Sequence, residues 1–164
     1  KPKNILKQIN TKNEISFNSK KFSRSFFDKL NLKLDLSYGR LNYLKKLSIL
    51  DDVFQCKGNI NLLEEFPLLF FDCSIIVDAK SDLLKKFNID TKKDDKTFNL
   101  SAKGNLSILN QKINFNAISL NENYKATNED LNYFKKNFEN ILFDKDFVGI
   151  FNLNKIKEFI LEVS

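Results

Sequence analysis

Histidine, methionine and tryptophan are missing from this chain of 164 residues, and it holds two cysteines, two prolines and four glycines. Without histidine, the usual zinc ligand sets, His-based acid–base catalysis and a catalytic triad are excluded. The sequence also lacks a Gly-rich phosphate loop and the Ser-x-x-Lys and Gly-x-Ser-x-Gly nucleophile motifs. We therefore expect a protein that is not an enzyme, with no catalytic residue, no metal site and no cofactor.

Long apolar runs are absent as well. No stretch of 18 apolar residues is present to form a transmembrane helix, and no signal-peptide core is visible. The chain begins at Lys1 and contains no methionine, so we expect that its natural N-terminus lies upstream. The length predicts one domain, and we expect it to be a fragment of a longer protein.

Positive charge is concentrated in the first third of the chain. Residues 1–46 carry twelve Lys or Arg against three acidic residues, within a net charge of +6. Such a segment suits nucleic acid or anionic lipid. Because these residues are mostly lysines and form no dense run, a solvated surface is the favoured interpretation, and we expect no nucleic-acid partner.

Alternating apolar residues predict strands. Residues 30–36 alternate leucine with polar residues. Residues 54–62 alternate polar residues with Phe54, Cys56, Gly58, Ile60 and Leu62, and residues 68–77 form an apolar run after Pro67. Residues 40–52 are ambiguous, because their leucines fit either a short helix or an irregular crossover.

The phrase Lys-Gly-Asn occurs twice, at residues 57–59 and 103–105, and each copy opens a predicted hairpin. In the first hairpin the chain reverses between Glu64 and Glu65. That register pairs Ile60 with Leu69, Gly58 with Phe71, Phe54 with Ile75, Lys57 with Asp72, and Cys56 with Cys73.

The second hairpin is expected to turn at Asn110-Gln111. Its predicted apolar pairs are Ile108 with Ile113, Leu106 with Phe115, and Gly104 with Ala117; its polar pairs are Ser107 with Asn114 and Asn105 with Asn116. Each glycine then lies on an apolar face, where it relieves crowding or permits a bend.

Helical patterns dominate the C-terminal quarter. Thr127 to Asp130 resembles a capping box, and apolar residues from Leu131 to Leu142 follow helical spacing. A second helix is predicted from about 152 to 163, and a short one near 81–87. The predicted fold class is α+β: a β-rich, twisted antiparallel sheet of six to eight strands in residues 1–126, followed by two helices in residues 127–164 that pack on the sheet.

The two cysteines leave two readings open. Cys56 and Cys73 face each other in the predicted register, which suits a disulfide if the domain is exported. Reduced thiols packed as small apolar groups are expected if it is cytosolic.

The apolar face of the sheet is the main functional candidate. By default it is a core beneath the helices, but it exceeds what two short helices cover, and uncovered apolar surface marks a lipid or partner site. The lipid-facing or core residues of this face are Phe54, Gly58, Ile60, Leu69, Phe71, Ile75, Leu106, Ile108 and Phe115.

Three stretches carry a family resemblance: CKGNINLLEEFPLLFFDCSIIVD, SAKGNLSILNQKINFNAISLN, and NYKATNEDLNYFKKNFENILFD with FNLNKIKEFILEV. Their order of hairpins and helices resembles the C-terminal region of the AsmA-like superfamily of Gram-negative envelope proteins, which includes the TamB and YhdP types. The resemblance implies a periplasmic protein held by an N-terminal inner-membrane helix, which this sequence lacks. It also implies a β-groove that passes phospholipid between membranes in outer-membrane biogenesis.

Two functions therefore follow as expectations. The first is a non-enzymatic envelope module that binds phospholipid or acyl chains on its apolar sheet face. The alternative is a structural or protein-interaction domain whose sheet edges pair with neighbouring domains of the same longer chain.

Overall fold

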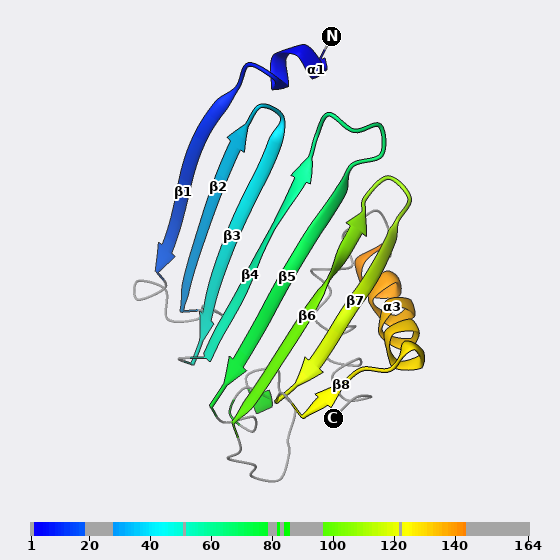
Figure 1. Ribbon diagram of the computed structural model, residues 1–164. Helices are drawn as coiled ribbons and strands as arrows, with labels where there is room; N and C mark the ends of the chain where they lie inside the picture. Colours follow the sequence, from blue (N-terminus) through cyan, green and yellow to red (C-terminus); the bar gives the residue numbers. More distant parts are fainter. Residues whose placement is uncertain are drawn as a thin grey trace.

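The computed structural model describes residues 2–18, 28–50, 52–78, 82, 84–85, 97–121 and 123–143 of the chain. Eight antiparallel strands lie side by side in chain order from β1 to β8 and form one sheet (Figure 1). The β-rich α+β class expected from the sequence is confirmed. The elements are α1 (Pro2–Leu6), β1 (Asn10–Asn18), β2 (Lys29–Ser37), β3 (Arg40–Ile49), β4 (Asp52–Asn61), β5 (Leu68–Val77), β6 (Phe98–Ser107), β7 (Lys112–Leu120), β8 (Tyr124–Lys125) and α3 (Asn128–Leu142).

The described residues between 40 and 52 form neither a helix nor an irregular crossover, and this part of the prediction is wrong. Residues 40–49 form β3, Leu50 is a turn residue, and Asp52 starts β4. The reason is the two-residue turn Tyr38-Gly39, where φ is 51° and 80°. Two positive φ values fit a type I′ turn, which returns the chain directly alongside β2. The backbone pairing of β3 with β2 and β4 then decides the conformation, even though the leucines have helical spacing.

The first Lys-Gly-Asn hairpin has the register expected from the sequence. All five predicted pairs occur between β4 and β5, including Gly58 with Phe71 and Cys56 with Cys73. The turn holds Leu62 to Pro67, and α1 is tied to it because Lys3 Nζ donates to the carbonyl oxygens of Leu63 (2.9 Å) and Glu64 (3.3 Å).

The second hairpin differs from the prediction by two residues. Leu106 pairs with Ile113 and Gly104 with Phe115. The cause is a four-residue turn, Ile108 to Gln111, in which Gln111 takes a left-handed φ of 50°. Ile108 is therefore a turn residue with 46% of its surface exposed, and it does not lie on the sheet face.

A β-bulge follows in the same hairpin. The register shifts between Lys103 and Gly104, so that Asn116 is left as the extra residue of β7 and Ala117 pairs with Lys103. The predicted pairs of Gly104 with Ala117 and of Asn105 with Asn116 are wrong because of the longer turn, which pairs Gly104 with Phe115 and Asn105 with Asn114 before the bulge is reached. A bulge bends the strand and increases the local twist, which suits its place beside a glycine.

Helix α3 closes the β7 side of the sheet. Its capping box is confirmed: the Asp130 N–H donates to Thr127 Oγ1 (3.3 Å), and the Thr127 N–H donates to Asp130 Oδ2 (2.8 Å). β8 pairs with β7 only at Ser119 and Leu120. Farther along the same edge of β7, the N–H of Ile113 donates to Glu139 Oε1 of the helix (3.0 Å). Covering an edge in this way limits unwanted strand pairing.

Some predictions concern parts of the chain that the structure does not describe. The second C-terminal helix, from about 152 to 163, lies outside the described residues. Of the short helix near 81–87, three residues are described, Asp82, Leu84 and Lys85, and they are helical. The helical segment begins at Asn128, close to the expected boundary between residues 126 and 127.

Candidate functional site

Alternation along the strands gives the sheet two different faces. Residues that pair across strands share a face, and residues next to one another along a strand point to opposite faces. The residues of β4 and β5 that were expected on one face do share it: Phe54, Gly58, Ile60, Leu69, Phe71 and Ile75. Leu106 and Phe115 lie on the same face. This apolar face continues across the two preceding strands. β3 contributes Leu41, Tyr43 and Leu47, and β2 contributes its four leucines, Leu30, Leu32, Leu34 and Leu36.

Much of the apolar face is only half-buried. Ile60 and Leu106 are buried, at 8% exposure each, whereas Phe54, Phe71 and Phe115 keep an intermediate exposure. Among the described elements, α3 makes its main contacts with β7. The apolar face therefore combines a few buried aliphatic side chains with aromatic side chains that are only half-buried.

The two Lys-Gly-Asn copies flank one strand. β4 and β6 both pair with β5, and both place their copy against the same three residues, Phe70, Phe71 and Asp72. Lysine meets Asp72 from each side, glycine meets Phe71 and asparagine meets Phe70. The phrase is repeated because two strands present the same surface to a shared neighbour.

The central pairs form an aromatic–glycine row across five strands, consisting of Tyr43, Gly58, Phe71, Gly104 and Phe115. The rings of Phe71 and Phe115 pack edge to face, with centroids 5.8 Å apart. Phe138 of α3 packs on Phe115 in the same manner at 5.4 Å, so the helix ends the row. Such pairs add about 0.5–1.5 kcal/mol beyond the burial of their area.

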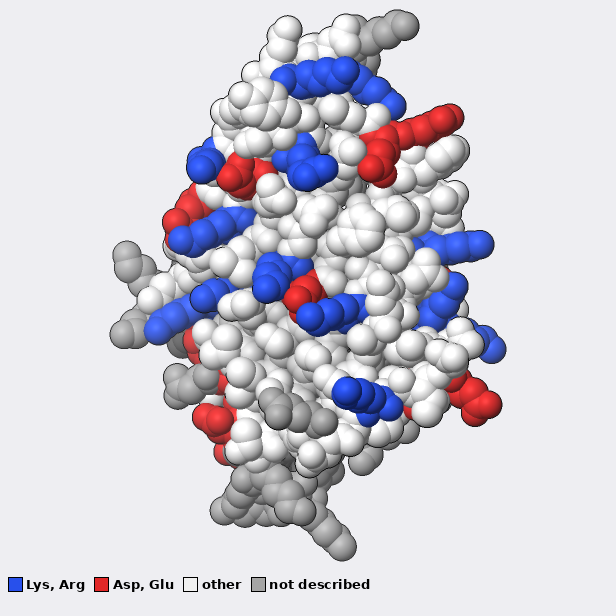
Figure 2. Space-filling model, viewed as in Figure 1, with Lys and Arg blue, Asp and Glu red and all other residues white. Residues whose placement is uncertain are grey.

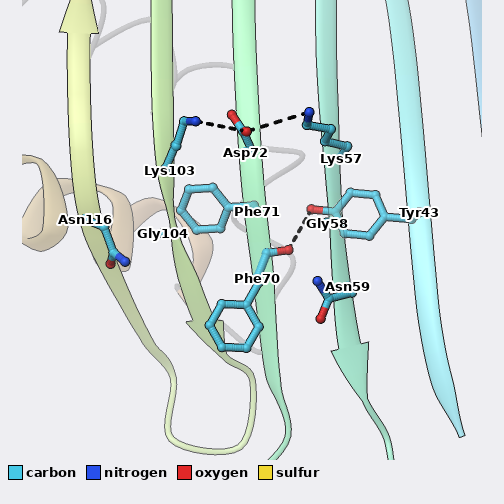
Figure 3. Close-up of a pocket in the computed structure, with 10 residues that line it drawn as sticks. All are labelled: Tyr43, Lys57, Gly58, Asn59, Phe70, Phe71, Asp72, Lys103, Gly104 and Asn116. Atoms are coloured by element: carbon cyan, nitrogen blue, oxygen red, sulfur yellow. Dashed lines mark hydrogen bonds and ion pairs between the residues drawn. The ribbon is translucent and has the colours of Figure 1, made fainter.

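Each glycine makes room for a ring from the preceding strand. Figure 3 shows the Tyr43 ring reaching from β3 toward Gly58 and the Phe71 ring reaching from β5 toward Gly104. A Cβ atom at Gly58 would lie 2.9 Å from Tyr43 Cε1, and one at Gly104 would lie 2.7 Å from Phe71 Cζ. Each Cβ would also collide with a backbone carbonyl oxygen of the following strand, that of Phe70 or of Asn114. Both positions therefore require glycine.

The lysines of the two copies converge on one carboxylate on the opposite face. Asp72 Oδ2 lies 3.2 Å from Lys103 Nζ and 3.9 Å from Lys57 Nζ (Figure 3). These three residues, Phe70 and both glycines line an open hollow of about 440 Å³. A single carboxylate between two exposed lysines stabilises the strand pairing modestly and is no acid–base pair.

The two cysteines lie next to the row. The structure joins Cys56 to Cys73 as a disulfide, with Cα atoms 4.0 Å apart. The Tyr43 hydroxyl lies 3.8 Å from Cys56 Sγ and donates to the carbonyl oxygen of Phe70 at 3.4 Å. Partial burial of this hydroxyl raises the pKa of Tyr43.

Two described lysines of the basic N-terminal third pair with acidic side chains. Lys12 lies 3.6 Å from Asp35, and Lys33 lies 3.3 Å from Glu14. Hydrogen bonds from Asn31 and then Lys33 lower the pKa of Glu14. On the face seen in Figure 2, basic and acidic side chains are interspersed among uncharged residues, and this face gives nucleic acid no continuous basic track.

Within the described ranges, no group of three or more His, Cys, Asp or Glu side chains is placed to hold a metal ion. No helix in the described part of the chain is long and apolar enough to cross a membrane.

Sequence reasoning missed three components of this site. Tyr43 was missed because β3 was not recognised as a strand. Extending the leucine alternation through the Tyr38-Gly39 turn pairs it only with Leu34, and its place beside Gly58 depends on the turn between β3 and β4. The contact of Phe138 with Phe115 joins a helix to a strand, and no short-range pattern reports it. The third component, Asn116, is the bulge residue, and its place depends on the turn length.

Comparison of the chain with protein-family models, curated proteins and solved structures finds no match in any of the three.

Proposed function

We propose that this chain is a non-enzymatic module whose apolar sheet face binds the acyl chains of phospholipids, as the resemblance to AsmA-like envelope proteins implies. The observation that supports it is the half-buried apolar face over the middle strands, which includes Phe54, Phe71 and Ile75. Monomeric proteins rarely leave a continuous apolar surface without a partner. In the proposed setting, the module belongs to a longer periplasmic protein anchored in the inner membrane.

The aromatic–glycine row suits such a ligand. Because Gly58 and Gly104 carry no side chains, the rings of Tyr43 and Phe71 lie over them, and aromatic surface runs across the row. An acyl chain that crosses the row gains about 0.8 kcal/mol for each methylene removed from water. About ten methylenes give roughly 8 kcal/mol before the cost of ordering the chain, which is enough for reversible binding.

Lipid content of the purified chain tests the proposal. We expect native mass spectrometry and solvent extraction to find bound phospholipid or fatty acid. The variant Ile75→Thr changes the apolar face and should lower the bound lipid, whereas Ile76→Thr changes the next residue, on the opposite face, and should not. A chain that binds no added lipid, or two variants with equal lipid content, would exclude acyl-chain binding by this face.

A second candidate function rests on strand β1. Eight of its nine residues are exposed, and in the described part of the chain it pairs only with β2. The exposed edge of β1 over residues 10–16 is able to accept another strand from a neighbouring domain. Sedimentation analysis tests it: association that rises with concentration and is abolished by Ile15→Lys supports edge pairing, while a monomer whose β1 amides exchange rapidly at every concentration contradicts it.

A further inference from the structure

Large apolar side chains are exposed together at one end of the sheet. This tip end consists of α1 and the turns β2–β3, β4–β5 and β6–β7, which lie at the top of Figure 1. Its five exposed apolar side chains show between 46% and 71% of their surface: Ile5, Tyr38, Phe66, Ile108 and Leu109.

These positions are unusual for apolar residues. Hairpin turns favour Gly, Asn, Asp, Ser and Pro, because those residues suit the backbone and leave it hydrated. Here each of three successive turns instead presents a large apolar side chain, and α1 adds another. Adjacent strands are about 4.8 Å apart, so the turns extend over a row of roughly 25 Å. A row of this kind presents several side chains to one flat surface.

The tip end is held together by hydrogen bonds between its parts. Lys3 ties α1 to the β4–β5 turn. The N–H of Tyr38 donates to Asn10 Oδ1 at 3.2 Å, and the N–H of Leu62 donates to the Gly39 carbonyl oxygen at 2.8 Å. Ile5, Tyr38 and Phe66 are therefore presented by segments that are tied to one another, which lowers the ordering cost of binding.

The charge of this end is positive. When the residue next to each of these segments is included, the described residues carry four exposed basic side chains, Lys3, Lys7, Arg40 and Lys112, against two acidic ones, Glu64 and Glu65. Apolar and aromatic side chains that protrude beside Lys and Arg match the interface of a bilayer with anionic headgroups. A neutral protein partner would have no need of this charge.

We propose that the tip end docks onto the surface of a bilayer containing anionic phospholipid. The apolar turn residues insert into the interface, the basic residues contact lipid phosphates, and the strands project away from the membrane. This goes beyond lipid binding by the apolar face, because it assigns a different surface, the strand ends, to a different object, the intact membrane.

Vesicle flotation tests the docking surface. We expect the chain to bind vesicles of phosphatidylcholine with about a third phosphatidylglycerol more strongly than pure phosphatidylcholine, and to lose this preference in high salt. The double variant Phe66→Ser, Leu109→Ser should weaken binding about tenfold, as expected for partial burial of two large apolar side chains. The matched control is Val53→Ser, Ile76→Ser, which removes two exposed apolar side chains that pair on the sheet; it should bind within about twofold of wild type.

Three outcomes would overturn the docking proposal: no binding of the wild type to either vesicle, equal binding by the tip and control variants, or tip-dependent self-association in the absence of vesicle binding. Thermal unfolding of each variant shows whether it folds. The double variant Lys7→Gln, Lys112→Gln offers a second test, because it removes two positive charges and leaves the apolar residues in place. Lipid content separates this proposal from the proposed function. A tip variant that keeps its bound lipid but no longer binds vesicles supports the docking proposal. A wild-type chain that carries bound lipid but does not bind vesicles contradicts the docking proposal and leaves the proposed function intact.

Discussion

Replacing Gly58 or Gly104 with alanine is predicted to destabilise the sheet. In an ordinary strand this substitution stabilises by about 0.5–1 kcal/mol, because glycine leaves more freedom to the unfolded chain. Here the new methyl group would collide with the carbonyl oxygen of Phe70 or of Asn114 and press on an aromatic ring. A carbonyl group beside a strand ladder cannot retreat without lengthening its hydrogen bonds.

The magnitude follows from these two opposing effects. Overpacking a close-packed site costs about 1–3 kcal/mol. Subtracting the gain expected for an ordinary strand leaves a net loss of roughly 0–2.5 kcal/mol in the free energy of unfolding, with a central value of about 1 kcal/mol. The losses at the two glycines should be similar, because each faces a ring from the preceding strand and a carbonyl oxygen from the following strand.

Guanidinium denaturation followed by far-ultraviolet circular dichroism measures the effect. The control is Asn59→Ala, an exposed neighbour of Gly58 on the other face, which should change stability by less than about 0.5 kcal/mol. If both glycine variants are as stable as the wild type or more stable, the row is not close-packed and its interpretation is refuted.

Three further predictions concern the surroundings of the row. Asp72→Asn should lower the free energy of unfolding by less than about 1 kcal/mol, and the difference from wild type should vanish in molar salt if the ion pairs to its two lysines account for it. A hydrogen bond from the Tyr124 hydroxyl, followed by bonds from Thr127, lowers the pKa of Asp130, so Tyr124→Phe should raise that pKa in a carboxyl NMR titration. The carboxylate stabilises the fold above the unfolded-state pKa of about 3.9, and this contribution is lost as pH falls through the lower folded pKa; an unchanged pKa in the variant would contradict the assignment. Reduction of the disulfide should lower the free energy of unfolding by about 3 kcal/mol from the loop that it closes, and finding two free thiols by mass in protein from an oxidising compartment would exclude the bond.

The β4–β5 hairpin was predictable because several pairings agreed on one register. Facing cysteines, the Lys57–Asp72 pair and the apolar pairs all fit the same turn. The predicted register of the β6–β7 hairpin failed because a four-residue turn replaced a two-residue one. A shift of two residues preserves the face of each side chain, so Leu106 and Phe115 were assigned to the correct face while Ile108 was not.

Strand β3 and the tip end were beyond sequence reasoning for different reasons. The leucines of β3 are spaced as in a helix, and Lys45 on the apolar face interrupts the strand pattern, so pairing with both neighbours decided the conformation. Phe66 and Leu109 are separated by more than forty residues, and only the antiparallel order of the strands places their turns at the same end of the sheet.

The most direct test of acyl-chain binding compares Ile75 with Ile76. Ile75 lies on the apolar face opposite Phe54, and Ile76 lies on the other face opposite Val53. We predict that a phospholipid with a nitroxide on its acyl chain broadens the methyl NMR signal of Ile75 and leaves that of Ile76 sharp. Equal broadening of the two signals, or broadening of Ile76 alone, would contradict lipid binding on the apolar face.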